Sequence, residues 1–321
     1  IEGVDASPLS GDSCGRISAD LGSSKCSALI HSPSGGSPLA YHDVAELCGG
    51  AGDTGTLLVR RGYEKGPNFD IVVGYDLSKE SMVRGLLRYV AAAKPVVLII
   101  STPCTGMKGF SALNRSINPA AWRRSRKVSV PLAKLGALAA LIQMKGGRHF
   151  IAEHPQGSDM WSLAEWLQLD QRFTVHKVDV HQCMLGLRGP RTKALIKKPT
   201  TFWASDSRLL ARLHGPRCDG RHVHADLAAT APGQPHEKAK HAARWPLPLC
   251  RRIAAGCEEV IRSHHRRMKT ASCGRNSPGH GKRGECEEAR PWDSSVCPSL
   301  SVSVSVSVSV FVFVSASVCL R

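Results

Sequence analysis

The residue of this chain best suited to covalent chemistry is Cys104, which follows Pro103 and the apolar run Val96–Ile100. The run has the composition of a buried strand, and the polar, glycine-containing segment after it predicts a loop. The carboxyl end of such a strand is where open α/β sheets bind ligands. A cysteine there becomes a nucleophile if nearby positive charge or a helix N-terminus lowers its thiol pKa. The alternative is a structural cysteine, because cysteine is among the residues most often buried.

A glycine turn, Gly49–Gly52, lies upstream and follows a second apolar strand pattern. Such a turn lets the backbone approach a ligand closely, and by itself it suits nicotinamide and methionine-derived cofactors equally. Asp76 ends the next predicted strand, where a carboxylate can bind ribose hydroxyls. Capping of the following helix is the other role for Asp76, and Asp70 is the second candidate for the ribose.

The order of these motifs resembles the cytosine-C5 methyltransferases, a branch of the S-adenosylmethionine-dependent methyltransferase fold. The closest likeness is to divergent versions in retroelement-type polyproteins, and it covers roughly residues 41 to 262. Phe150–Pro155 stands where that family has a strand ending in Glu-Asn-Val. The other matching positions are Glu46, Gly50 and Gly52 in the first motif, and Pro103, Cys104, Phe110 and Ser111 in the nucleophile motif, with the Phe-Ser pair a few residues late.

The resemblance implies methyl transfer from S-adenosylmethionine to C5 of cytosine in nucleic acid. Cys104 would add to C6 of the base, and Glu153 would hold N3 as an acid whose pKa is raised by burial. Arg188 or Arg191 would stabilise the base carbonyl. His154 replaces the family's Asn after Glu153, and a carboxylate that caps nearby backbone is the alternative role there. The positions implied for the cofactor are Glu46, Gly50, Gly52, Asp53, Asp76 and Pro103.

The formal net charge of +17 favours a polyanionic partner such as nucleic acid and carries no information on the fold. We expect DNA rather than RNA, with the target base flipped out or single-stranded. The segment between Lys198 and Arg244 is too short for the family's usual target-recognition domain, which predicts weak sequence specificity or a partner that supplies it. The basic residues nearest the predicted site, expected to contact phosphates, are Arg123, Arg124, Arg126 and Lys127.

A Cys/His cluster within that short segment has the pattern H-x3-C-x3-H-x-H, from His214 to His224. Zinc takes Cys and His in tetrahedral sets, so Cys218, His222 and His224 are candidate ligands. The spacing is not that of a recognised finger, and surface or packing roles are the alternative.

Strand and helix patterns alternate from Tyr41 onward, which predicts a mainly parallel, Rossmann-like sheet with helices on both faces. One helix separates Asp76 from the Val96 strand, so one strand–helix unit of a standard methyltransferase is missing. The predicted strands are Asp43–Leu47, Phe69–Tyr75, Val96–Ser101, Arg148–Ala152, Thr174–Val180 and Thr192–Lys197. The predicted helices are Thr54–Arg61, Lys79–Ala93, Val130–Lys145, Ser162–Leu169 and Leu247 to about His264.

We expect three parts in the chain: a disordered segment 1–40, the methyltransferase-like domain 41–262 with an insert at about 205–240, and a tail 263–321. The tail is basic and then becomes a Ser-Val repeat, which has too much serine for a membrane span. Twelve cysteines without a CxxC pair, and no secretory signal, predict an intracellular protein, nuclear or cytoplasmic. Because the first residue is Ile1, we expect the chain to be a fragment.

Two other functions fit the same sequence. One is a catalytically degenerate nucleic-acid-binding module from a mobile element, and the other is a methyltransferase that acts on an amine.

Overall fold

The computed structural model describes residues 41–108, 111–189, 193–225 and 242–273. All of them belong to the first of two units into which the chain divides, residues 1–274. The predicted disordered segment 1–40 and most of the predicted tail lie outside the described residues, as do Phe110 and Arg191.

A six-stranded mixed sheet forms the centre of the described part, in the order β2-β1-β3-β4-β6-β5. The first four strands in this order are parallel, and β6 runs antiparallel to both β4 and β5. β2 and β3 lie on opposite sides of β1, so the chain reverses its direction of winding between β1 and β3. The crevice at the carboxyl ends of strands at such a reversal is the usual ligand site of an open α/β sheet. The strands are β1 Val44–Leu47, β2 Lys65–Phe69, β3 Val97–Ile100, β4 His149–Pro155, β5 His176–His181 and β6 Pro199–Ala204.

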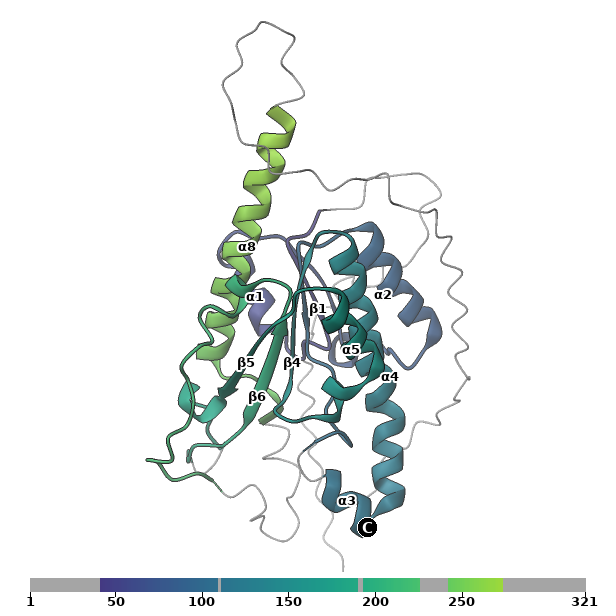
Figure 1. Cartoon of the computed structure of the whole chain (residues 1–321), viewed down its shortest axis with the longest axis vertical. Coiled ribbons are helices and arrows are strands. Elements are labelled where there is room, and N and C mark those ends of the chain that lie inside the picture. Colours follow the sequence, from purple (N-terminus) through teal and green to yellow (C-terminus); the bar gives the residue numbers. More distant parts are fainter. Residues whose placement is uncertain (1–40, 109–110, 190–192, 226–241, 274–321) are drawn as a thin grey trace, which may run out of the picture. The chain divides into compact units, whose positions relative to one another are not determined.

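Helices cover both faces of this sheet (Figure 1). One hydrophobic core lies under α2 (Glu80–Ala92), α4 (Pro119–Lys145) and α5 (Ala164–Arg172). The other lies under α1 (Asp53–Val59), α6 (Ser207–Leu210) and α8 (Leu247–Cys273). Side chains alternate across a strand, so Leu98 and Ile100 of β3 enter the first core while Val97 and Ile99 enter the second. The remaining elements are α3 (Ser111–Ile117) and the 3-10 turns η2 (Ile71–Val73), η3 (Asp159–Ser162) and η4 (Gln182–Leu185).

The expected α/β architecture with helices on both faces is confirmed, and most predicted elements are present with shifted ends. α2 is the only α-helix between Asp76 and β3, as the sequence predicts. α4 begins at Pro119 rather than Val130, because the Asn118 side chain accepts a hydrogen bond from the Ala121 N–H and caps an earlier start.

Two predicted strands are wrong. The strand predicted at Phe69–Tyr75 is replaced by β2, which ends at Phe69, because the Asp70 carboxylate accepts from the Val72 N–H and turns the chain. The apolar residues of η2 are exposed, so an apolar run that predicts a buried strand instead forms a turn at the surface. The strand predicted at Thr192–Lys197 is also wrong. Its described residues make only isolated bridges at Leu195, and the strand that follows is β6.

α8 continues to Cys273, beyond the predicted end at about His264 and beyond the predicted domain boundary at 262. The first residues of the predicted basic tail are therefore helical. Among the described helices, α4 alone is long and apolar enough to cross a membrane, but its apolar side chains pack into the first core beneath the sheet. This is the environment of a core helix.

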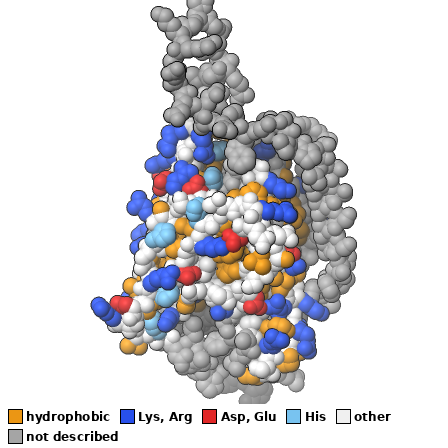
Figure 2. Space-filling view, in the orientation of Figure 1, with side chains coloured by type: hydrophobic (Ala, Val, Ile, Leu, Met, Phe, Trp, Pro, Cys, Tyr) orange, Lys and Arg blue, Asp and Glu red, His pale blue; other side chains and the backbone are white. Residues whose placement is uncertain are grey.

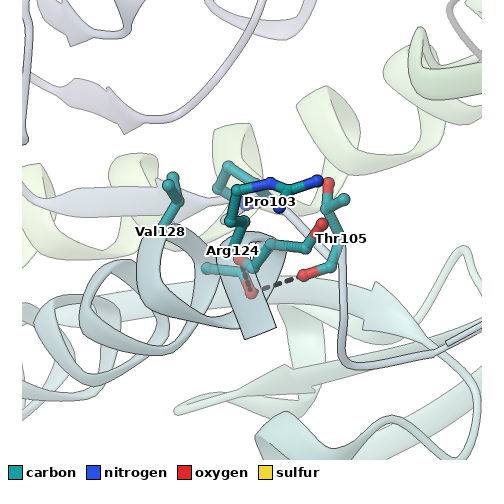
Figure 3. Close-up of a pocket in the computed structure, with 6 residues that line it drawn as sticks. Pro103, Thr105, Arg124 and Val128 are labelled. Carbon is teal, nitrogen blue, oxygen red and sulfur yellow. Dashed lines mark hydrogen bonds between the residues drawn. The ribbon is translucent and has the colours of Figure 1, made fainter. Parts of the chain in front are cut away.

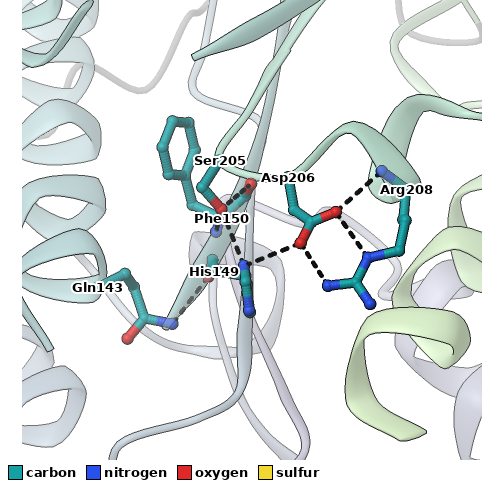
Figure 4. A network of polar contacts seen from close by, with 6 residues as sticks. All are labelled: Gln143, His149, Phe150, Ser205, Asp206 and Arg208. Carbon is teal, nitrogen blue, oxygen red and sulfur yellow. Dashed lines mark hydrogen bonds and ion pairs between the residues drawn. The ribbon is translucent and has the colours of Figure 1, made fainter. Parts of the chain in front are cut away.

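A polar network ties the start of β4 to the end of β6 at the sheet edge opposite the carboxyl ends of the parallel strands (Figure 4). Ser205 Oγ accepts from the Phe150 N–H at 3.0 Å and lies 3.3 Å from His149 Nδ1. Asp206 lies 4.0 Å from the same ring nitrogen and holds Arg208 through two hydrogen bonds. Burial lowers the pKa of His149 to about 4, although the Asp206 carboxylate acts in the opposite direction.

This buried histidine predicts a loss of stability in mild acid. In the unfolded chain this imidazole takes up a proton near pH 6.5, whereas in the folded protein it stays neutral down to about pH 4. The contribution of neutral His149 to the free energy of unfolding is therefore complete above pH 6.5 and is lost as the pH falls towards 4. The loss approaches about 1.4 kcal/mol per pH unit in that window. Denaturant unfolding at several pH values measures it. His149→Asn should flatten the dependence, while the exposed-residue control His214→Asn should not; an unchanged slope in His149→Asn would contradict the assignment.

Candidate functional site

The carboxyl ends of β1, β3 and β4 bring together the segments that the sequence singled out. The Ser101 N–H donates to the Leu47 carbonyl at 2.9 Å, which places the chain after β3 beside the chain after β1. Ile100 of β3 pairs with Ala152 of β4, and Glu153 follows at the same edge. The glycine turn, Cys104 and Glu153 therefore lie at one edge, at the reversal between β1 and β3.

Cys104, Glu153 and Lys198 form the charged centre of this edge. Cys104 is exposed, whereas Glu153 is buried, with a carboxylate oxygen 3.7 Å from Lys198 Nζ. Desolvation and the Glu153 carboxylate raise the pKa of the Cys104 thiol, and the Lys198 ammonium acts in the opposite direction. The thiol pKa is therefore not lowered, as it would be in an activated nucleophile. The structure instead shows the two charged neighbours, Glu153 and Lys198, that shift this pKa in opposite directions.

Several buried polar atoms at this edge lack a hydrogen bond of ordinary geometry. They are Ser101 Oγ, Glu153 Oε1 and both ring nitrogens of His154. Buried polar groups in proteins are nearly always satisfied, so these atoms are available to bind a ligand or water. The His154 ring packs edge-on against Trp161, and burial lowers its pKa to about 4. It is neutral at physiological pH.

The loop after Cys104 is fixed by α4. The Met107 N–H donates to the Cys104 carbonyl at 3.0 Å, and Met107 itself is buried. Gly106 has φ +80°, and a Cβ there would lie 3.0 Å from the Arg126 backbone nitrogen. Ser129 Oγ donates to the Thr105 carbonyl. Glycine is required at position 106 because the loop both turns in the left-handed region and crosses α4 closely.

An open pocket of about 330 Å³ lies between this loop and α4 (Figure 3). Pro103 and Thr105, the two neighbours of Cys104, line it from one side. Arg124, Ser125, Val128 and Ser129 line it from α4. The pocket thus combines an apolar wall with the cationic side chain of Arg124, and Cys104 is not among the residues that line it.

The four residues predicted to contact phosphates lie on α4 and differ in their exposure. Arg123, Arg124 and Lys127 are exposed, and Figure 2 shows basic side chains gathered over α3 and the start of α4, at the lower right. Arg126 is instead held internally, by hydrogen bonds to the Gly106 carbonyl and to Asp159 at 2.7 Å. Its role in the structure is to anchor the loop.

Glu46 helps to hold the glycine turn in place. It is buried, accepts a hydrogen bond from the Gly55 N–H in the first turn of α1, and lies 3.1 Å from Lys65 Nζ. Gly52 has φ +68°, and a Cβ there would lie 2.6 Å from Lys65 Nζ and 2.8 Å from the Glu46 carboxylate. Both carboxylate oxygens of Glu46 therefore face protein donors.

Gly50 presents its open side to solvent. It has φ +58°, and a Cβ there would meet no atom within 4 Å. Asn68, a residue not expected at the site, accepts from the Gly49 N–H at 3.1 Å and donates to the Gly50 carbonyl at 2.8 Å. The turn is thus held rigidly while one side of it is left accessible.

The prediction that Asp76 ends the second strand is wrong. Asp70 follows β2 directly and accepts from the Gly50 N–H at 2.8 Å, so it lies against the glycine turn. Asp76 comes after η2 and accepts two hydrogen bonds from Ser78 in the turn before α2, whose N-cap is Lys79, so Asp76 does not cap that helix either. Asp70, the second candidate for the ribose, therefore has the better position.

Asp53 is paired with Arg244, which donates two hydrogen bonds to it at 2.7 and 2.8 Å. The Arg244 guanidinium holds the pKa of the Asp53 carboxyl below its usual value. Arg244 directly precedes the approach to α8, so this pair brings the start of α8 to the glycine turn.

Neither predicted arginine of the 186–191 segment is placed at the site. The exposed Arg188 donates to the Lys193 carbonyl at 2.8 Å, and Arg191 lies outside the described residues. Lys198, which the sequence reasoning missed, is the described cation closest to Glu153 and precedes β6. Its position follows from the antiparallel pairing of β6 with β4, which puts the start of β6 at the edge where β4 ends.

A second cluster follows the carboxyl end of β5, at the same end of the sheet, where Cys183 of η4 meets the loop 218–224. The ligand atoms of Cys183, Cys218, His222 and His224 all lie within 4.8 Å of one another. The three predicted candidates are therefore together. His214 is not a member, and Cys183 was missed because it is distant in the sequence.

A scan of the chain against protein-family models found no match, and a search of curated protein sequences found none either.

Proposed function

We propose that this chain is a nucleic-acid methyltransferase that uses S-adenosylmethionine and attacks C6 of cytosine with Cys104. The observation that carries the proposal is the electrostatic grouping of Cys104, Glu153 and Lys198 at the winding reversal of the sheet, with a pocket next to the Cys104 loop. For covalent activation of a pyrimidine, a thiol can act as the nucleophile, a carboxyl group as the acid, and a cation can stabilise the thiolate.

The residues after β1 and β2 fit a nucleoside cofactor. Gly50 leaves open space at the turn, and Asp70 offers a carboxylate at the end of the neighbouring strand. The exposed Ile71, Val72 and Val73 next to Asp70 provide an apolar surface for a base ring. Glu46 and Asp53 would then support the cofactor site through Lys65 and Arg244 rather than bind the cofactor themselves.

Cys104 and Glu153 supply each other's reactive forms. Transfer of the thiol proton to Glu153 gives a thiolate and a carboxylic acid in one step, and the Lys198 ammonium stabilises the thiolate. The thiolate then bonds to C6 of the base while Glu153 gives the proton to N3, which moves the electron pair of the C5–C6 double bond to C5. When bound, S-adenosylmethionine supplies an electrophilic methyl group for C5.

The remaining step restores the enzyme. Once C5 carries the methyl group, water removes the C5 proton, and the electron pair of that C–H bond re-forms the C5–C6 double bond. The Cys104 sulfur leaves C6 as thiolate, and the proton at N3 returns to Glu153. Protons and electrons balance with no further reactant.

The exposed basic face of α4 predicts electrostatic binding of nucleic acid. Replacing both Arg123 and Arg124 with alanine should weaken binding to all sequences alike and reduce the slope of log K against log salt by about 0.9 for each phosphate that is no longer neutralised. Fluorescence anisotropy at several salt concentrations measures this. The control Arg84→Ala removes an exposed arginine of α2 that pairs with Glu80. Equal slopes in all three proteins would place the nucleic acid elsewhere.

The proposed activity is tested by incubating the chain with S-adenosylmethionine labelled in the methyl group and cytosine-containing single- and double-stranded oligonucleotides. Digestion to nucleosides should recover the label in 5-methylcytosine. Label in an adenine or in an exocyclic amine would show a methyltransferase of another class. Binding of the oligonucleotides without binding of the cofactor would show a module that retains only recognition.

That last outcome corresponds to the second candidate, a catalytically degenerate nucleic-acid-binding module. The specific observation in its favour is that two carboxylates predicted to bind the cofactor already have partners within the protein. Glu46 accepts a hydrogen bond from the first turn of α1, and Asp53 pairs with Arg244.

A further inference from the structure

The cluster around Cys218 has the donor set and the spacing of a metal centre. Cys218 Sγ lies 3.6 Å from His222 Nε2 and 3.4 Å from His224 Nε2. Tetrahedral zinc, with Zn–S of about 2.3 Å and Zn–N of about 2.0–2.1 Å, requires a sulfur–nitrogen separation of about 3.6 Å. The ligand atom of the fourth group, the buried Cys183, lies within 4.8 Å of the other three.

The backbone around Cys218 is shaped to hold a sulfur ligand. The Gly220 N–H points at Cys218 Sγ at 3.4 Å, and the Cys218 N–H donates to His181 Nδ1 at 2.9 Å. Gly220 has φ +81°, which allows the tight turn between Cys218 and His222. Such a turn aims Cys218 and His222 at one point although they are only four residues apart.

From this donor set we propose that Cys183, Cys218, His222 and His224 bind one zinc ion in a closed, four-ligand structural site. Two thiolates and two imidazoles are a ligand set that zinc takes in structural sites, and four protein ligands leave no open position for a substrate. The site shares no residue with Cys104, Glu153 and Lys198 and has a different task.

The task is to fix a loop that has no regular secondary structure. Between α6 and Ala225 the described chain forms no helix or strand. It is joined to the end of β5 by the hydrogen bond from the His181 N–H to the Pro216 carbonyl and by the Arg217–Asp179 ion pair, and a bridge links His224 to Leu195. Cross-linking Cys183 to residues 218–224 closes a long segment of chain, which lowers the entropy of the unfolded state and makes metal binding part of folding.

The same segment carries Lys198. Gln182, the neighbour of Cys183, donates its N–H to the Lys198 carbonyl at 3.1 Å and its side-chain amide to Thr200 at 2.9 Å. Fixing Cys183 therefore also fixes the backbone of Lys198 beside Glu153. The bearing of this on catalysis rests on the proposed function, whereas metal binding itself does not.

Elemental analysis of the full chain, purified without chelator, tests the proposal. We expect about one zinc ion per chain, as for a single four-ligand site. His222→Ala and Cys218→Ser should lose most of it, while His214→Ala, in the same loop but outside the cluster, should retain it. Zinc that remains in the His222 and Cys218 variants would overturn the proposal.

Cobalt substitution keeps the test decisive if a variant fails to fold. After zinc is exchanged, the wild-type chain should show the visible bands of tetrahedral cobalt and a thiolate-to-cobalt charge-transfer band, which Cys183→Ser should reduce to about half because one of two thiolates is removed. A chain that binds neither zinc nor cobalt, or that carries a Cys183–Cys218 disulfide in place of metal, would overturn the proposal regardless of its methyltransferase activity.

Discussion

Cys104→Ser is expected to abolish methyl transfer to cytosine, with a loss of at least about a thousandfold, while binding of S-adenosylmethionine and of nucleic acid stays within about twofold of the wild type. A serine hydroxyl cannot be deprotonated by the neighbouring carboxylate at neutral pH, so the covalent step fails. The cofactor is expected at the glycine turn and Asp70, which follow β1 and β2, whereas Cys104 follows β3. Single-turnover transfer and equilibrium dialysis measure the two effects separately.

Cys257→Ala is the matched control, because this thiol belongs to α8 and is fully buried in the second core. It should cost stability and leave transfer intact. Equal losses of activity in the two variants would indicate a folding effect, and full activity in Cys104→Ser would remove Cys104 from the mechanism.

Glu153→Gln should have the second largest effect, a loss of about 10² to 10⁴ in the rate of transfer, because glutamine can neither accept the thiol proton nor protonate N3. The same change has a second readout that needs no substrate. The Glu153 carboxylate raises the pKa of the Cys104 thiol and Lys198 lowers it. The midpoint of the pH profile for alkylation of Cys104 should therefore fall in Glu153→Gln and rise in Lys198→Met.

Controls for these two changes are Asp170→Asn and Lys134→Met, which remove exposed members of surface ion pairs. Neither should move the alkylation midpoint. Shifts of the same sign in Glu153→Gln and Lys198→Met would mean that these residues act on Cys104 through packing rather than through charge.

The sequence was a good guide where a local pattern decides the structure. The apolar runs before the glycine turn and before Cys104 are adjacent parallel strands, and Gly52 is a glycine because the backbone is left-handed against Lys65 and Glu46. The cluster of Cys218, His222 and His224 was likewise visible in the spacing, since a tight turn can bring such near neighbours together.

The sequence failed where distant chain segments decide the outcome. Asp70 and Asp76 both follow apolar residues, and the choice between them depends on hydrogen bonds from the Gly50 and Val72 N–H groups to Asp70. Lys198 lies near Glu153 because β6 pairs antiparallel with β4. No local sequence pattern predicts that pairing. Cys183 joins the Cys/His cluster for a similar reason, across the β5–β6 pair.

The central claim, covalent activation of cytosine by Cys104, is tested most directly with oligonucleotides that contain 5-fluorocytosine, incubated with the chain and S-adenosylmethionine. Fluorine at C5 cannot leave as a proton does, so the last step stops and the sulfur–C6 bond persists. We expect a denaturation-resistant protein–oligonucleotide adduct that maps to Cys104 by peptide mass spectrometry and is absent in Cys104→Ser. A chain that methylates cytosine without forming the adduct, or an adduct that persists in Cys104→Ser, would contradict the account.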